Sequence, residues 1–239
     1  MDDVDSLLIA MFDGGVEVCA SPLIGDRQDL FPEERAAVAT AVDKRVRDFA
    51  TGRLCARRLL TRFGVREAIL PVASDGRPVW PPGFVGSISH AADLCVVTVA
   101  RQEQVASLGV DVEVDRGLEE RTWHLVCTDA EMEWINSQAA AGRASLVTAL
   151  FSAKEAVHKC TSPFSAQPFE PRRFSIEWDG AADVFHASVD DSANRQVTGR
   201  IVRRYGWIFS AVQLPQAYST SRRLAPTSAG SKASNSSGT

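Results

Sequence analysis

The sequence has no excess of basic charge, no long apolar run and no signal-peptide pattern. It carries 26 Lys and Arg against 30 Asp and Glu, for a formal net charge of −4 over 239 residues. A nucleic-acid-binding surface usually needs a basic excess or a dense basic stripe, so this balance argues against one. No apolar stretch approaches the roughly 20 residues of a membrane-spanning helix, and the first residues, MDDVDSLL, are acidic where a signal peptide is basic. We therefore expect a cytoplasmic protein without a nucleic-acid or membrane partner.

Paired cysteine motifs and phosphate-binding glycine motifs are also missing. The five cysteines are dispersed, form no C-x-x-C pair, and do not combine with the four histidines into a zinc-site spacing. An odd number of dispersed thiols predicts reduced and mostly buried cysteines. Because there is no Walker A or G-x-G-x-x-G pattern, a nucleotide would have to be held by side chains rather than by a glycine-rich loop.

Helix-type and strand-type patterns follow one another twice along the chain. Pro32 opens a helical stretch that ends near Gly64, with Gly52 as a candidate break. Residues 71–86 are dense in Pro and Gly and are expected to be loop. The other expected elements are strands at 7–11, 94–100, 107–114, 174–178, 183–189, 196–205 and 207–214, and helices starting near Asp129 and covering about 146–160.

This order predicts an α+β fold of two halves of similar size. We expect one half in residues 1–104 and the other in residues 105–214. The composition, 45% hydrophobic and 23% charged, agrees with a globular core. Residues 215–239 are rich in Ser, Ala and Gly, and they are expected to form a disordered tail.

Acidic and apolar residues alternate in the expected strand GVDVEV. Because successive side chains on a strand point to opposite faces, Asp111, Glu113 and Asp115 share one face. The valines between them cover the other face and fix the register, since a slip of one residue would bury the acids. Two carboxylates at i and i+2 can reach one hard cation such as Mg²⁺. Taken alone, however, the pattern favours an ordinary amphipathic strand with a solvated acidic face.

The segment LFSAKEAVHKC places acidic and basic groups on an expected helix. Glu155 and Lys159 are four residues apart and share a face, whereas Lys154 points about a quarter-turn away. A functional interpretation makes Glu155 a third carboxylate near the metal and puts Lys159 close to a phosphate. Without further context, an exposed ion pair is the simpler interpretation. The residues that can form the buried stripe of this helix are Leu150, Ala153, Val157 and Cys160.

Two further groups are candidates for contact with a phosphorylated ligand. Ser89 and His90 stand just before a buried strand, where side chains and N–H groups can face a ligand, although a structural histidine is the commoner case. They form no nucleophile elbow. Arg45 and Arg53 lie on the expected basic helix, and arginine forks match phosphate oxygens. A solvated basic helix face is the alternative.

The order and spacing of these motifs are more specific than any one of them. The series runs R-x₇-R-x-C-A-R, W-P-x-G-x-x-G-S-x-S-H, G-V-D-V-E and F-S-A-K-E-A-x-x-K. It resembles the Sfp/EntD-type 4′-phosphopantetheinyl transferase superfamily, in particular the actinomycete enzymes that serve polyketide and nonribosomal peptide synthetases. The similarity covers roughly residues 30–160. It implies a pseudo-twofold pair of similar α+β halves, each with helices packed on a small antiparallel sheet, and a monomeric enzyme.

The resemblance implies a reaction and a set of site residues. The reaction would move the 4′-phosphopantetheine group from coenzyme A to a serine of apo acyl or peptidyl carrier proteins, with Mg²⁺ as cofactor and 3′,5′-ADP as the second product. Asp111, Glu113 and Glu155 would hold Mg²⁺, and Glu155, Lys159 and His90 would be catalytic. The residues implied to contact coenzyme A are Arg45, Arg53, Arg77, Ser89, His90, Asp111, Lys154, Glu155 and Lys159.

Some positions depart from the family pattern. Val112, between the two acids, cannot be a metal ligand, so water and pyrophosphate oxygens would have to complete the Mg²⁺ shell. His158 stands where an aromatic residue is usual, residues 160–162 replace an Ala-Trp stretch, and Arg77 would substitute for a lysine of some relatives. The rival hypotheses are another Mg²⁺-dependent enzyme, such as a nucleotide phosphohydrolase, and a non-catalytic module that binds coenzyme A or a carrier protein. The cost of burying three acids without a cation argues against the module.

Overall fold

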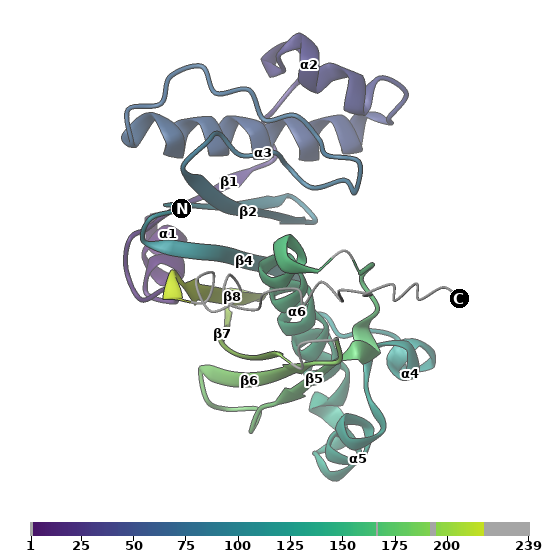
Figure 1. Cartoon of the computed structure of the whole chain (residues 1–239). Coiled ribbons are helices and arrows are strands. Elements are labelled where there is room, and N and C mark those ends of the chain that lie inside the picture. The colour runs from purple at the N-terminus through teal and green to yellow at the C-terminus, as the bar shows by residue number, and fades with distance from the viewer. Residues whose placement is uncertain (1, 166, 192–194, 218–239) are drawn as a thin grey trace, which may run out of the picture.

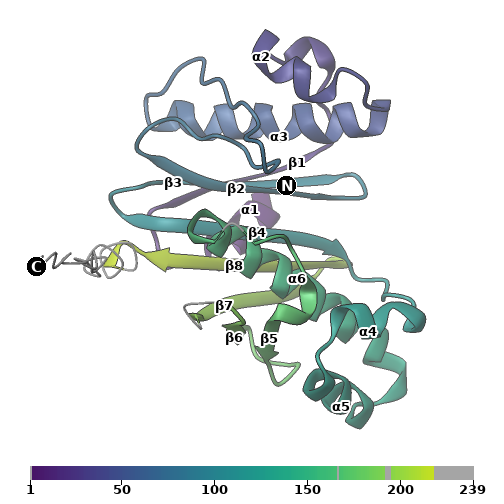
Figure 2. The ribbon, with the colours of Figure 1, turned by 45° about the vertical axis from the view of Figure 1, so that its right-hand side comes forward.

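Two antiparallel sheets lie face to face between two long helices (Figures 1 and 2). The computed structural model describes residues 2–165, 167–191 and 195–217. The α-helices are α1 (Asp2–Ile9), α2 (Pro32–Arg35), α3 (Asp43–Arg62), α4 (Trp123–Val126), α5 (Asp129–Ser137) and α6 (Arg143–Thr161). The strands are β1 (Val16–Pro22), β2 (Phe84–Ala91), β3 (Leu94–Arg101), β4 (Val105–Val114), β5 (Phe174–Glu177), β6 (Val184–Val189), β7 (Arg195–Arg204) and β8 (Trp207–Pro215).

The strands form two small sheets, each with one long helix on its outer face. One sheet has the strand order β1-β3-β2, and the other has the order β4-β8-β7-β6-β5. Figure 1 shows α3 above the first sheet and α6 against the second. The predicted α+β class, with helices on two small antiparallel sheets, is therefore confirmed.

Apolar residues on both faces of β3 hold the first sheet between α3 and the second sheet. Val97 and Val99 pack on one face with Leu59 of α3. Val96 packs on the other face with Val110 of the second sheet. Because β3 is buried on both sides, its sequence is the continuous apolar run LCVVTVA rather than an alternating one.

Helix α6 lies directly on β4. A Cβ atom at Gly109 would be 1.9 Å from the carbonyl oxygen of Ala156, so glycine is required for this close approach. Asp111 and Glu113 follow at i+2 and i+4 and therefore share the face of Gly109, toward α6. The stripe of α6 that packs into the core includes the four predicted residues, Leu150, Ala153, Val157 and Cys160.

Strand β4 is an edge strand of its sheet, and two serine side chains of β2 bond to its outer edge. Ser87 Oγ accepts a hydrogen bond from the Val110 N–H at 3.0 Å, and Ser89 Oγ accepts one from the Val112 N–H at 3.4 Å. A buried backbone N–H is costly unless it is paired, so these hydroxyls take the place of a neighbouring strand. The two sheets are thus joined by bonds from side chain to backbone.

Three expectations for the first part of the chain are wrong. Helix α1 occupies the place of the strand expected at 7–11, since acidic residues at its start favour the helix dipole. Strand β1 was not expected at all. The expected loop at 71–86 contains the start of β2, so Ser89 and His90 lie within a strand and not before one. Glycine and serine are weak strand formers, and here pairing with β3 overrides that local preference.

Several other expectations can be compared with the structure. Gly52 does not break α3, which continues to Arg62. All five cysteines are buried free thiols, as predicted. No helix in the described part of the chain is long and apolar enough to cross a membrane. The expected tail at 215–239 lies, beyond Ala217, outside the described residues, and the division into halves at residue 104 stays a prediction.

Candidate active site

Three carboxylates and one ammonium group gather where β4 faces α6. Asp111 and Glu113 come from β4, and Glu155 and Lys159 come from successive turns of α6. Lys159 Nζ lies 2.7 Å from Asp111 Oδ1 and 4.0 Å from Glu155 Oε2. The i,i+2 spacing on the strand and the i,i+4 spacing on the helix thus bring together four of the side chains that the sequence indicated.

Ser89 is bonded to this carboxylate cluster from the neighbouring sheet. Its hydroxyl donates to Asp111 Oδ1 at 2.8 Å and accepts from Lys159 Nζ at 3.0 Å. Asp111 is almost fully buried, at 3% exposure. One carboxylate oxygen of Asp111 is therefore held by two donors from different elements.

Burial and, after it, neighbouring charges of the same sign shift the pKa values of the acids. Burial, together with the nearby charges of Asp111 and Glu155, raises the pKa of Glu113 to about 7, and the ammonium of Lys159 opposes this only in part. Burial also raises the pKa of Glu155, again against Lys159. Groups with a common charge and little access to water favour their neutral forms. A cation among these carboxylates would favour their charged forms and so lower both pKa values.

We expect Glu113→Gln to stabilise the ligand-free protein at pH 8 and to leave its stability unchanged near pH 4.5. A carboxyl whose pKa is raised on folding contributes its full stability below its ordinary pKa of 4.5, and loses it as the pH rises through about 7. The urea midpoint, measured in EDTA at both pH values, tests this. Glu177→Gln, at an exposed position on β5, should behave like wild type at both values. An equal effect of Glu113→Gln at both values would contradict the electrostatic cause.

The donor set at this cluster suits a hard divalent cation. Carboxylate oxygens are the ligands that Mg²⁺ prefers in proteins, and Lys159 already places one positive charge in contact with two of the acids. Within residues 2–165, 167–191 and 195–217, no three His, Cys, Asp or Glu side chains stand close enough to form a ready metal-binding group. The acids would therefore have to draw together around an ion. By charge and chemistry, the residues that fit Mg²⁺ are Asp111, Glu113 and Glu155.

His90 belongs to a second cluster, at the start of α3. Arg45 Nη1 lies 3.2 Å from His90 Nε2, and Asp48 Oδ2 lies 3.9 Å from His90 Nδ1. Because an arginine can only donate, His90 Nε2 must accept here, which requires the neutral ring with its proton on Nδ1. Burial lowers the pKa of His90, although Asp48 acts in the opposite direction. An anion beside Arg45 would favour the protonated ring.

Two cavities connect the clusters. The larger, of about 710 Å³, has Glu155 and Lys159 in its wall. The smaller, of about 120 Å³, is lined by Arg45, Arg53 and His90 among others. Glu155, Lys159 and the basic cluster therefore lie along one continuous surface. The residues that belong to both cavities are Gly76, Pro78 and Ile88.

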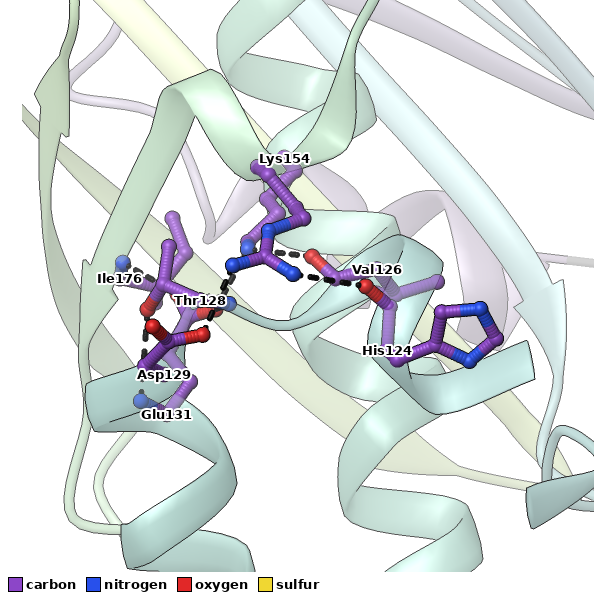
Figure 3. A network of polar contacts seen from close by, with 8 residues as sticks. His124, Val126, Thr128, Asp129, Glu131, Lys154 and Ile176 are labelled. Atoms are coloured by element: carbon purple, nitrogen blue, oxygen red, sulfur yellow. Dashed lines mark hydrogen bonds and ion pairs between the residues drawn. The ribbon is translucent and has the colours of Figure 1, made fainter. Parts of the chain in front are cut away.

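Lys154 does not face this surface. It is fully buried, and its Nζ donates to the Val126 carbonyl at 2.7 Å and to Glu131 Oε2 at 2.5 Å (Figure 3). Glu131 also accepts from the backbone N–H groups of Thr128 and Ile176, each at 2.7 Å. The structure thus contradicts the expectation that Lys154 contacts coenzyme A. Adjacent residues on a helix point about 100° apart, so the rotation that aims the next residue at the site turns Lys154 into the core.

Comparison with known proteins identifies the family. A family model described as the 4′-phosphopantetheinyl transferase N-terminal domain matches residues 33–100, and one described as the 4′-phosphopantetheinyl transferase superfamily matches residues 107–205. The 4′-phosphopantetheinyl transferase Npt of Nocardia iowensis is 34% identical over 165 residues, which are 66% of this chain and 73% of the relative. This chain belongs to the 4′-phosphopantetheinyl transferase superfamily.

Other members of the superfamily are similar over comparable lengths. The 4′-phosphopantetheinyl transferase Svp of Streptomyces mobaraensis is 39% identical over 160 residues, which are 66% of this chain and 65% of the relative. The 4′-phosphopantetheinyl transferase PptT of Mycobacterium tuberculosis is 34% identical over 151 residues, which are 62% of this chain and 66% of the relative. The matched segment thus spans about two thirds of these transferases.

Two arginines implied by the superfamily resemblance are already engaged. Arg53 is buried; its Nε donates to the Leu70 carbonyl at 3.0 Å, and its guanidinium lies 4.0 Å from the centre of the Phe49 ring. Arg77 Nη2 lies 2.6 Å from Asp75 Oδ2, in a loop that lines the larger cavity. Arg53 has only its remaining N–H groups for a ligand, whereas the half-exposed Arg77 can exchange its carboxylate for a phosphate.

One departure from the superfamily pattern lies in the cavity wall. His158 lines the larger cavity and packs on Phe169, with 5.1 Å between ring centroids. Burial lowers its pKa, so the neutral ring takes the place of the usual aromatic side chain. Cys160 is fully buried against the sheet and does not reach the cavity surface.

Sequence reasoning missed three residues that support the site. They are Asp48, which lies beside His90; Ser87 of β2, which bonds to the edge of β4; and Glu131, which pairs with Lys154. The predicted start of a helix near Asp129 is confirmed, and a capping box of Thr128 and Glu131 forms this helix start. The second bond of Glu131, to a lysine on another helix, has no local signal in the sequence.

Proposed function

We propose that this chain transfers 4′-phosphopantetheine from coenzyme A to a serine of apo acyl or peptidyl carrier proteins, in a Mg²⁺-dependent reaction that also yields 3′,5′-ADP. Membership of the superfamily supports the reaction type. The observation that carries the proposal is the meeting of Asp111, Glu113, Glu155 and Lys159 beside a cavity of about 710 Å³. The adjoining cluster of Arg45 and His90 suits the phosphates of the same ligand.

The basic residues would bind and orient coenzyme A. Arg45 and His90 would take the 3′-phosphate side, with Arg53 behind them and Arg77 over the larger cavity. Bound Mg²⁺ would supply Lewis-acid neutralisation of the pyrophosphate charge, with Asp111, Glu113 and Glu155 as the residues that hold it. Lys159, which contacts Asp111 without ligand, would donate to a phosphoryl oxygen. Catalysis then depends mainly on positioning and electrostatics.

Proton transfer would involve Glu155. The carrier serine oxygen forms a bond to the phosphorus next to pantetheine, while the bond from that phosphorus to the bridging oxygen breaks and its electron pair leaves with 3′,5′-ADP. Glu155, directly or through a water molecule, takes the serine proton. With a cation in the site, Glu155 is held in its charged form, which is the form that can accept this proton.

The natural partners would be carrier proteins of polyketide or nonribosomal peptide synthetases, and the process would then be antibiotic biosynthesis. We propose a cytoplasmic monomer that contacts neither nucleic acid nor membrane. A panel of apo acyl and peptidyl carriers, compared by kcat/KM, would identify the preferred class, and the same assay with acylated coenzyme A would define the donor.

Mass spectrometry of the carrier tests the proposed reaction. The full chain is mixed with coenzyme A, Mg²⁺ and an apo carrier, and the carrier should gain the mass of one phosphopantetheine group. Failure with every carrier of a broad panel would exclude the transferase function. Release of phosphate from nucleotides without any carrier would instead support a phosphohydrolase. Binding of coenzyme A without transfer would support a non-catalytic module.

Arg45→Gln is expected to raise the KM for coenzyme A by about 10-fold or more, with little change in kcat. A hydrogen bond to a charged group contributes about 1.5–3 kcal/mol, and an interaction made equally with substrate and transition state affects KM alone. Arg47→Gln is the matched control, because Arg47 lies on the same helix but lines a different cavity. Equal effects of the two substitutions would contradict a specific role for Arg45.

A further inference from the structure

Some buried side-chain oxygens lack a hydrogen-bond partner among the residues that the structure describes, and three of them are on β4, α6 and β8, the elements that meet at the carboxylate cluster. These three are Asp111 Oδ2, Ser152 Oγ and Ser210 Oγ. Ser152 and Ser210 are fully buried, and Asp111 is 3% exposed. Buried polar atoms in proteins are nearly always hydrogen-bonded, so these unpaired atoms require an explanation.

Ser210 and Asp111 are neighbours on the sheet face that α6 covers. They are directly opposite each other in the β4–β8 register, and opposite residues of antiparallel strands project to the same face. On β8, the flanking residues Ile208 and Val212 pack in one cluster with α6, whereas Phe209 packs toward the first sheet. Alternation along the strand therefore places the Ser210 hydroxyl on the side of α6.

The alignment of α6 with β4 brings Ser152 to the same place. Ala156 contacts β4 at Gly109, and Ser145 donates a hydrogen bond to Asp115, so the helix and the strand run in opposite directions (Figure 2). On the helix, Ser152 lies between the two contact residues Ser145 and Ala156. On the strand, Asp111 lies between their partners, Gly109 and Asp115. Ser152 is also one turn from Ala156 and projects from the same helix face.

We propose that Asp111, Ser152 and Ser210 together bind one buried water molecule. The three oxygens are enclosed, lie in one layer, and are not bonded to one another. An ordered internal water typically makes about three hydrogen bonds to such groups. A serine hydroxyl can donate or accept, and a carboxylate oxygen accepts. One water can therefore donate to Asp111 Oδ2 and complete its bonds with the two serines.

This water fixes the Asp111 carboxylate on its second oxygen. Ser89 and Lys159 hold Oδ1 at 2.8 and 2.7 Å, and the water holds Oδ2, so the carboxylate plane cannot rotate. A carboxylate oxygen has lone pairs for both a water and a cation, so this bond is compatible with metal binding. Ser152 and Ser210 are thus positioning residues for Asp111, a role that rests on the proposed function.

The test uses Ser152→Ala, Ser210→Ala and the double variant in the full chain. The urea midpoint should fall. The Mg²⁺ concentration for half-maximal carrier modification should rise by about 10-fold, because groups that hydrogen-bond to metal ligands typically contribute 10- to 100-fold to metal affinity or activity. If no water is bound and the two serine hydroxyls have no partner, their removal should leave the urea midpoint unchanged or raise it, and the Mg²⁺ requirement should stay unchanged. A crystal structure of the wild-type chain should show a water within hydrogen-bonding distance of all three oxygens.

Thr98→Val is the matched control. Thr98 Oγ1 is also buried without a partner among the described residues, but its strand neighbours Val96 and Ala100 face the layer between the sheets. This variant should keep the wild-type Mg²⁺ requirement. Wild-type values for the double variant, or a crystal structure without the water, would overturn the proposal. If the wild-type chain modifies no carrier, the proposed function fails, while the crystal structure and the urea midpoints still decide the water site.

Discussion

Replacing Asp111 with asparagine is expected to lower kcat/KM for carrier modification by about 10³-fold. The substitution keeps the size of the side chain but removes the charge that would bind Mg²⁺ and that contacts Lys159 at 2.7 Å. Metal-ion stabilisation of a phosphoryl transition state contributes several kcal/mol, and about 4 kcal/mol corresponds to 10³ in rate. Mass spectrometry of the carrier at a series of times gives the rate.

The matched control for Asp111 is Asp183→Asn, which makes the same chemical change at an exposed position just before β6. It should retain wild-type turnover. Circular dichroism should show both variants folded, since the asparagine can still accept a bond from Ser89. Wild-type turnover by Asp111→Asn would contradict the assignment of this residue as a metal-binding acid.

Lys154→Met is expected to lower the free energy of unfolding by about 3–5 kcal/mol, the usual cost of leaving one partner of a buried ion pair alone. Lys154 and Glu131 are both buried, and no water can replace the lost ammonium at the Val126 carbonyl without entering the core. The network joins α6 to α4, α5 and β5 (Figure 3). Equilibrium unfolding in urea at pH 7 measures the loss.

Lys44→Met provides the comparison for the same chemical change at the surface. The Lys44 side chain is 59% exposed and pairs at 3.1 Å with Asp48, whose side chain is 6% exposed. Because water already solvates the Lys44 ammonium, its loss should cost less than the loss of the buried Lys154 ammonium. Adding Glu131→Gln to Lys154→Met should recover part of the stability, since no buried charge then remains unpaired and the amide oxygen can still accept a backbone hydrogen bond. Equal losses for Lys44→Met and Lys154→Met would show that the buried pair has no special role.

The sequence predicted those parts of the fold and site that have a local cause. Alternation of acids and valines in β4 placed Asp111 and Glu113 on one face, and helical spacing placed Glu155 and Lys159 on another. A register and a helix period are fixed by neighbours a few residues apart, so a short window of sequence contains them. The capping box at the start of α5 was predictable for the same reason.

The features that were missed depend on contacts between distant segments. Lys154 and Glu131 are 23 residues apart in the sequence, and so are Ser87 and Val110. Whether a lysine next to the site points into a cavity or into the core depends on how far its helix is rotated, which packing against other elements decides. Strand β2 likewise forms because β3 supplies its partners, not because its glycine and serine residues favour extended backbone.

The serine bonds on β4 have a consequence for recognition. Because Ser87 and Ser89 occupy the N–H groups of Val110 and Val112, an extended peptide cannot add itself as a strand at this point of the edge. A substrate therefore cannot bind beside the carboxylates as an added β-strand. A protein substrate would have to be recognised by contacts with its side chains and folded surface. The same two serine bonds also protect against edge-to-edge aggregation, because they pair backbone N–H groups that an exposed edge strand would leave unpaired.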